Sequence, residues 1–257
     1  MVRDPRFNHR IRSILVMLAT VATIAFYSMA SSGNVGGRSA AEILDAYPTV
    51  FSLAGYALSI WSLIFLGLAV FSIYQVLPVN LSRYGSIRTP YIASCVLACA
   101  WIYSWHHQRM GSAVILALGL TATLLYIASR FRTTVKPMET WAVKGTFGLY
   151  SGWVTVMGIV DLFMWFASFG SAAATSTLFA ILAVVVLTGA AVMVTWRISN
   201  HFFPFAIAWG LTAVAVKQSS NTAIVAAGAI CVIICLVAAL SFVLTLPSRT
   251  PTNKDDE

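Results

Sequence analysis

Long runs of apolar residues, separated by short polar segments, extend over most of this chain. A helix of about 20 apolar residues is long enough to cross the roughly 30 Å hydrocarbon core of a lipid bilayer. Eight runs approach or exceed that length, at residues 13–30, 51–77, 90–106, 111–130, 141–168, 174–196, 202–217 and 222–246. The pattern therefore predicts an all-α fold, a polytopic membrane bundle of about eight transmembrane helices.

Composition supports a membrane protein and excludes most soluble classes. Hydrophobic residues make up 59% of the 257 residues and charged residues 9%, and the mean hydropathy is +0.84. Soluble domains carry about 25% charged residues, because a folded surface in water needs them. So few charges indicate a chain whose main solvent is lipid.

The net charge of +8 would suggest nucleic acid binding in a soluble protein, but here the positions of the basic residues indicate topology. Thirteen of the 16 Lys and Arg residues fall on the same side as the two termini, and only Arg38, Arg109 and Lys217 fall on the other. Cytoplasmic loops carry such an excess of basic residues. We therefore expect a multi-pass protein of a bacterial inner membrane, with both termini cytoplasmic and no nucleic acid partner.

The first apolar run has two interpretations. It follows Arg10 and Arg12 and ends at Ser28, Met29 and Ala30, which is also the pattern of a secretory signal with a small-residue cleavage site. A retained helix gives eight spans, with this helix as a signal anchor. Cleavage would leave seven spans without changing the orientation of the others.

Asp161 is the one acidic residue that falls inside an apolar run. A carboxyl group in the membrane is costly, so it should face the bundle interior and have a partner or be protonated. Its depth places it near the level of Lys217, Arg109 and His106. We expect a polar cluster in which Lys217 or Arg109 pairs with Asp161, although a purely structural hydrogen bond between helices is the open alternative.

No pattern predicts a metal site or an enzyme. The cysteines form two i, i+4 pairs inside spans, whereas structural zinc sites use closer pairs on loops. His106 is suited either to a polar cap at the interface or to binding the central metal of a tetrapyrrole. Because no Walker loop, nucleophile elbow or HExxH sequence is present, we expect no catalytic residues and no required cofactor.

Tryptophans are the other marked feature of the apolar runs. Trp61, Trp101 and Trp153 lie deep within their runs, and Trp101 shares a helix face with Trp105. Such rings serve as packing, or as flat apolar walls for a planar ligand. In the fifth run, Gly148 and Gly152 form a small-xxx-small pair that would let another helix approach closely.

These aromatic positions resemble the tryptophan-rich sensory protein family (TspO, the translocator protein). Pro48 is followed by Trp61 and Phe65, similar to that family's proline-rich entry and Trp-x-x-x-Tyr. Leu97-Ala-Cys-Ala-Trp101 is similar to its Leu-Asn-x-x-Trp, with Ala98 in place of the Asn. Tyr150-Ser-Gly-Trp153 and then Asp161 is similar to its Tyr-x-x-Trp, where the later residue is Asn. The resemblance covers five helices.

The resemblance implies a fold and a ligand. Residues 1–170 would form a TspO-like five-helix core, residues 171–246 three additional transmembrane helices, and residues 247–257 a disordered cytoplasmic tail. The family binds porphyrins, haem and sterols between its helices and often dimerises, so a homodimer or larger membrane complex is an expected partner. The implied ligand-binding residues are Trp61, Phe65, Trp101, Trp105, Tyr150, Trp153 and Asp161, with Lys217, Arg109 and His106 as polar partners.

Three functions are therefore open. The first is a non-enzymatic binding or sensory protein that holds a flat apolar molecule, tetrapyrrole-like or sterol-like, in an aromatic pocket. The second is a proton-coupled transporter that uses Asp161 as a relay. The third is an accessory subunit of a membrane or pigment complex, in which the helices are packing surface.

Overall fold

Helices occupy all eight predicted runs in the computed structural model, which describes residues 5–134 and 136–244. The long helices are α1 (Pro5–Ser31), α3 (Ile60–Tyr74), α4 (Arg88–His106), α5 (Met110–Ser129), α7 (Thr146–Ser168), α8 (Thr177–Ile198), α9 (Phe202–Lys217) and α10 (Thr222–Leu244). Shorter elements are α2 (Ala40–Asp45), α6 (Pro137–Glu139), the 3-10 turns η1 (Gly55–Ser59), η2 (Pro78–Asn80) and η4 (Ala172–Thr175), and the π-helical segment η3 (Thr140–Gly145). The predicted tail, 247–257, lies outside the described residues.

The apolar lengths of these helices confirm a polytopic membrane bundle. Within the described residues, six helical segments are long and apolar enough to span a bilayer: His9–Ser31, Gly55–Tyr74, Met110–Ser129, Pro137–Ser168, Thr177–Ile198 and Thr222–Ser241. The other two predicted spans are α9, which is short at 16 residues, and α4, which carries more polar residues. Because both are packed between other long helices, they can be shorter or more polar than helices that face lipid.

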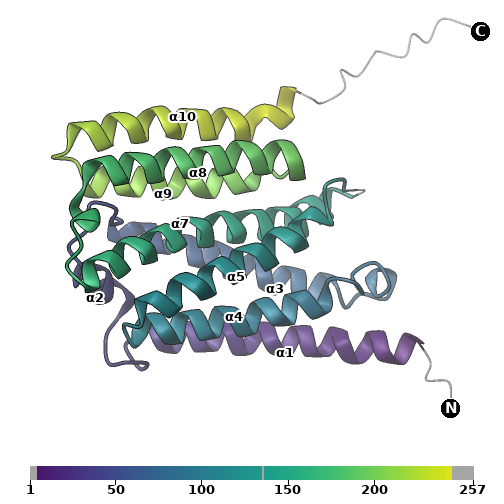
Figure 1. Cartoon of the computed structure of the whole chain (residues 1–257). Helices are drawn as coiled ribbons and strands as arrows, with labels where there is room; N and C mark the ends of the chain where they lie inside the picture. Colours follow the sequence, from purple (N-terminus) through teal and green to yellow (C-terminus); the bar gives the residue numbers. More distant parts are fainter. Residues whose placement is uncertain (1–4, 135, 245–257) are drawn as a thin grey trace, which may run out of the picture.

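The helices lie side by side in one bundle with α7 near its middle (Figure 1). On one side of α7 lie α1, α3, α4 and α5, and on the other α8, α9 and α10. Helix α1 begins and α10 ends at the same end of the bundle, while α2 lies at the opposite end. This arrangement is the one that eight alternating crossings produce. Which end faces the cytoplasm stays a prediction from the basic residues.

The glycine pair of α7 allows a close contact with α9 of the same chain. A Cβ added at Gly152 would lie 2.6 Å from the Phe203 carbonyl oxygen and 2.8 Å from the Ala206 Cβ, and one at Gly148 would overlap the Asn200 side chain. The small residues thus let the two backbones approach, as in other membrane helix pairs. The expected close helix–helix contact is confirmed, and its partner is one of the additional C-terminal helices.

Hydrogen bonds also join the predicted core to the three C-terminal helices. The Ala54 N–H donates to the Ala213 carbonyl oxygen (3.2 Å), and the Trp209 indole N–H donates to the Ala57 carbonyl oxygen (3.1 Å). These bonds occur where the chain enters α3, before regular helical bonding begins. They fix α9 against the start of α3. The predicted boundary between a core of residues 1–170 and additional helices of residues 171–246 stays a prediction, because these contacts do not show whether either part folds without the other.

A buried arginine ties α1, α3 and α4 together at the end where α1 begins. Arg88 is fully buried and donates from Nε to Gln75 Oε1 (2.8 Å) and from Nη2 to the Gln75 carbonyl oxygen (3.2 Å). Gln75 in turn donates to the Ser13 carbonyl oxygen (2.9 Å). This network satisfies the guanidinium with neutral acceptors from neighbouring helices.

The loop between α3 and α4 is held by a second charged contact. Arg83 donates from Nε and Nη2 to the two oxygens of Glu139, at 2.6 and 2.8 Å. The Tyr84 hydroxyl donates to the same carboxyl group at 3.0 Å, and burial together with this carboxylate raises the pKa of Tyr84 well above its ordinary value. The loop is thereby fixed to the start of the α6–α7 segment.

Candidate functional site

Asp161 faces the interior of the bundle, among indole rings. It lies in the middle of α7 and is fully buried. The Trp101 indole N–H donates to its Oδ2 atom at 2.6 Å, and the Trp105 indole also interacts with the carboxyl group. An indole is a donor only, so it satisfies a carboxyl oxygen without adding a second charge. The predicted inward orientation of Asp161 is therefore found, with a partner that we did not expect.

The predicted ion pair of Asp161 with Lys217 or Arg109 is wrong. Lys217 lies at the end of α9, where its ammonium group reaches the loop and pairs with Asp45 Oδ1 at 3.0 Å. Arg109 is exposed just before α5. Both cations stay at the membrane boundary, where water solvates them, rather than enter the apolar interior. The third expected polar partner, His106, lies in a different position, beside the cavity described below.

Six aromatic rings from four helices form one cluster around Trp61. The Trp61 ring centroid is 4.7 Å from that of Tyr27, 5.4 Å from Phe65, 5.8 Å from Tyr150, 6.1 Å from Trp101 and 6.4 Å from Trp153. These distances are typical of aromatic pairs in direct contact. The structure thus brings together the aromatic residues that the resemblance implies, although they are widely separated in the sequence.

A cavity of about 320 Å³ opens next to this cluster. Its walls come from α1, α2, η1, α3, α4 and α7, and the residues that line it are Ile24, Tyr27, Ser28, Ser31, Ala40, Leu58, Trp61, Ser62, Phe65, Trp105, His106 and Met157. Of the predicted site residues, Trp61, Phe65, Trp105 and His106 line the cavity directly. The volume is at the lower end of the range of small-molecule sites.

The remaining predicted residues form a layer around this wall. Trp101, Tyr150 and Trp153 contact Trp61, and Asp161 contacts Trp101. None of these four lines the cavity, so their role is to support the rings that do. The position of Ala98, where the family has Asn, is fully buried as well.

The α1 side of the cavity is what our sequence analysis missed. Tyr27 and Ile24 of α1 line it, and Tyr27 contacts both Trp61 and Phe65. The spacing of Thr20, Thr23 and Tyr27 along one face of α1 was an available signal. Cleavage after Ala30 would remove this wall, so the site requires a retained first helix.

Five buried polar atoms around the cluster lack a hydrogen bond of normal geometry within the described residues. They are the Tyr27 hydroxyl, the indole N–H groups of Trp105 and Trp153, His106 Nε2 and Asp161 Oδ1. Buried polar atoms are nearly always paired, so each exception needs an explanation, such as a bound water or ligand. Some of these groups do have weaker contacts: Tyr27 with Tyr150, His106 with the Ala30 backbone, and Trp105 with the Asp161 carboxyl group. All five residues belong to the cavity wall or to the rings and carboxyl group packed behind it.

The connection between α1 and α2, residues 32–39, packs against His106, a residue of the cavity wall. Gly36 has a φ of +71° and packs directly against the His106 backbone, where a Cβ would overlap. Ser39 then caps α2: its N–H donates to Glu42 Oε2 at 2.7 Å, which holds the pKa of Glu42 below its ordinary value. Ala40 follows and lines the cavity.

The arrangement fits an organic ligand better than a bare metal ion. The described residues contain no group of three or more potential metal ligands, and their four cysteines are free thiols. His106 donates from Nδ1 to the Ile102 carbonyl oxygen at 3.0 Å, and its ring also interacts with the Ala30 backbone, so it offers no set of free ligands at the cavity wall. Aromatic walls with a few separate polar atoms are typical of sites for flat apolar molecules.

Comparison with known families agrees with this geometry. The family model described as "TSPO-like protein" matches residues 13–242, which is most of the chain. No match to a curated protein or to a solved structure was found. The matched range includes α8, α9 and α10 as well as the five helices on which the resemblance was based. This chain therefore belongs to the family of TSPO-like proteins.

Proposed function

We propose that this chain is a membrane binding protein that holds a flat, mostly apolar molecule, such as a tetrapyrrole or a sterol, in the aromatic cavity. The observation that carries the proposal is the cavity beside the Trp61 cluster, together with the buried polar atoms around it that lack a hydrogen bond of normal geometry in the described residues. Family membership supports the same function. Nothing in the site suggests a nucleophile activated by a base, so the proposed role is binding and not catalysis.

The walls of the cavity explain how such a ligand would be held. Trp61 and Phe65 stack at 24° to one another and present flat apolar surface. A planar molecule placed against them gains apolar burial and ring–ring contact. Trp105 and His106 also line the cavity and add ring nitrogens that have no hydrogen bond of normal geometry in the described residues. They would fix the orientation of a ligand that carries a polar edge.

Tryptophan fluorescence is the direct test, with protoporphyrin as the probe. We expect saturable quenching of the purified protein in detergent. Trp61→Leu should weaken binding about ten-fold, because it removes the central ring of the wall. Trp141→Leu is the matched control, since Trp141 is 69% exposed and lies outside the cluster. Quenching that is not saturable, or an equal effect of both substitutions, would count against the proposal.

The two alternatives predict different results. A proton-coupled transporter requires a pH-dependent flux in proteoliposomes that Asp161→Asn abolishes, and such a flux would replace our proposal. An accessory subunit requires a stable partner that co-purifies in mild detergent and covers the cavity side of the bundle. We favour binding because the indole contacts of Asp161 give it a supporting position behind the cavity wall.

A further inference from the structure

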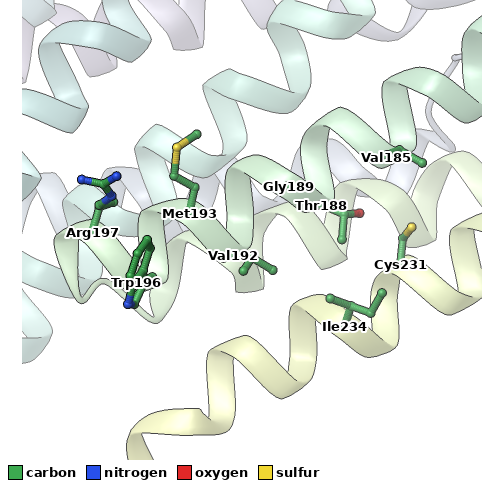
Figure 2. A pocket seen from close by; sticks show the side chains of 9 residues that line it. All are labelled: Val185, Thr188, Gly189, Val192, Met193, Trp196, Arg197, Cys231 and Ile234. Carbon is green, nitrogen blue, oxygen red and sulfur yellow. The ribbon is translucent and has the colours of Figure 1, made fainter.

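A second, larger cavity lies on the other side of the molecule, between α8 and α10. Its volume is about 570 Å³, and it is lined by Val185, Thr188, Gly189, Val192, Met193, Trp196, Arg197, Cys231 and Ile234. Figure 2 shows these residues along α8 from Val185 to Arg197, with Cys231 and Ile234 on the facing side of α10. We call it the α8–α10 groove. It is separate from the aromatic cavity, with which it shares no residue.

The floor of the groove is apolar over most of its length. The Thr188 hydroxyl donates to the Val184 carbonyl oxygen at 2.8 Å, so it offers no free donor to a ligand. A Cβ added at Gly189 would meet no atom within 4 Å, which shows open space beside this helix position. An apolar groove without free polar groups is complementary to a hydrocarbon chain and not to a polar molecule.

One end of the groove carries a positive charge. Arg197 is exposed, its guanidinium lies 5.0 Å from the centre of the Trp196 ring, and within the described residues it forms no ion pair. Trp196 is 75% exposed, as is typical of tryptophans at the level of lipid headgroups. A cation at this level attracts anionic headgroups.

The length of the groove matches one leaflet of a bilayer. From Val185 to Arg197 the helix rises about 18 Å, at about 1.5 Å per residue. Half of a hydrocarbon core about 30 Å thick is about 15 Å. An acyl chain in the groove would therefore run from the headgroup level to about the bilayer midplane.

We propose that the α8–α10 groove binds one anionic phospholipid, with an acyl chain along Gly189 and its phosphate group at Arg197. The charge at one end, the satisfied hydroxyl on the floor and the length of a single leaflet together favour this occupant. This site does not depend on the ligand of the aromatic cavity. A second copy of the chain is the main competing occupant, and the experiment below separates the two.

Native mass spectrometry of the protein from mixed micelles tests the proposal. The probes are phosphatidylglycerol and phosphatidylcholine with the same acyl chains. We expect one phosphatidylglycerol to be retained in preference to phosphatidylcholine by about five-fold, since one basic residue near a membrane surface contributes about that much. Arg197→Gln should abolish the preference. Gly189→Leu should reduce retention of both lipids, because Gly189 lines the groove and an added Cβ there has open space, so the leucine side chain extends into the volume of the acyl chain.

Arg130→Gln is the matched control. Arg130 also lies at a helix end with its guanidinium over an aromatic ring, 5.8 Å from the centre of Tyr126, but it does not line the groove. Equal retention of the two lipids, or an equal loss of preference in Arg130→Gln, would overturn the proposal. So would a dimer that Gly189→Leu dissociates without changing lipid retention, because a second copy of the chain would then occupy the groove.

Discussion

At the scale of single residues, Asp161 is held by an indole rather than by a cation. Its Oδ2 accepts from Trp101 at 2.6 Å, while Oδ1 has no hydrogen bond of normal geometry in the described residues. Lys217, which we expected as its partner, pairs with Asp45 at the end of α2. The Asp161 side chain therefore fixes the position of Trp101, and Trp101 packs against the cavity residue Trp61.

Replacing Asp161 by alanine should lower the free energy of unfolding more than replacing it by asparagine. In Asp161→Ala the Trp101 N–H stays buried without a partner, a loss of about 1–3 kcal/mol in unfolding free energy. In Asp161→Asn the amide oxygen still accepts, so we expect a smaller loss. Thermal unfolding in detergent, followed by circular dichroism, gives the comparison. If Asn proved as destabilising as Ala, the indole contact would not be the role of this residue.

Sequence reasoning predicted which residues gather here but not how they pair. An acid and several tryptophans inside apolar runs must face inward, because lipid cannot solvate a carboxyl group. The choice between Trp101 and Lys217 as partner depends on helix rotation and on the position of Asp45, the last residue of the short helix α2. No local pattern encodes that long-range geometry.

At the scale of helices, the contact between α7 and α9 depends on Gly152, whereas Gly158 of α7 faces α5. A Cβ at Gly152 would lie 2.6 Å from the Phe203 carbonyl oxygen, whereas one at Gly158 would make an ordinary 3.6 Å contact with Ala117. We expect Gly152→Ala to lower the unfolding free energy by about 1–3 kcal/mol, because backbone must move. Gly158→Ala on the same helix should be close to neutral in the same unfolding measurement. Equal effects would mean that close backbone approach is not what these glycines provide.

The connection between α1 and α2, which packs against His106, allows a second matched comparison. Gly36 and Gly37 both have positive φ, +71° and +75°, so alanine strains the backbone at either position. Only at Gly36 would the new Cβ overlap the His106 backbone, because Gly37 has open space around it. Gly36→Ala should therefore weaken protoporphyrin binding several-fold more than Gly37→Ala, measured as the ratio of dissociation constants. If both variants bound protoporphyrin with the same affinity, the contact between Gly36 and His106 would not influence the cavity.

Sequence patterns were most informative about helices and least informative about their ends. The predicted run 51–77 becomes the 3-10 turn η1 followed by α3, and at its start the Ala54 N–H and the Ala57 carbonyl oxygen form hydrogen bonds with α9. The run 141–168 starts earlier, at Pro137, and passes through a π-helical segment. Tertiary contacts set these ends, whereas apolar length alone sets the existence of the spans.

At the scale of the whole molecule, α8, α9 and α10 are part of the family fold. The match over residues 13–242 includes them, and α9 packs against α7 and the start of α3. Our sequence analysis treated them as additions, since the motifs that carry the resemblance end at Asp161. Apolar helices without aromatic motifs give little signal of family membership, although their packing contacts extend into the core.

Labelling with an impermeant maleimide in intact cells tests the predicted orientation. Arg109→Cys lies in a loop that we place outside, and Arg132→Cys in a loop that we place in the cytoplasm with both termini. The cysteine at 109 should react at once, and the one at 132 only after the membrane is permeabilised. If the cysteine at 132 reacted at once and the one at 109 only after permeabilisation, the predicted orientation would be wrong. The evidence for the cavity does not depend on this result.

The most direct test of the aromatic cavity is a nuclear magnetic resonance titration of the indole N–H groups. The chain has eight tryptophans, so each resonance can be assigned by substitution. When protoporphyrin is added, the resonances of Trp61 and Trp105 should shift most, while those of the exposed Trp141 and Trp196 stay in place. Shifts confined to the exposed tryptophans, or no shift at saturating ligand, would contradict a binding site in this cavity.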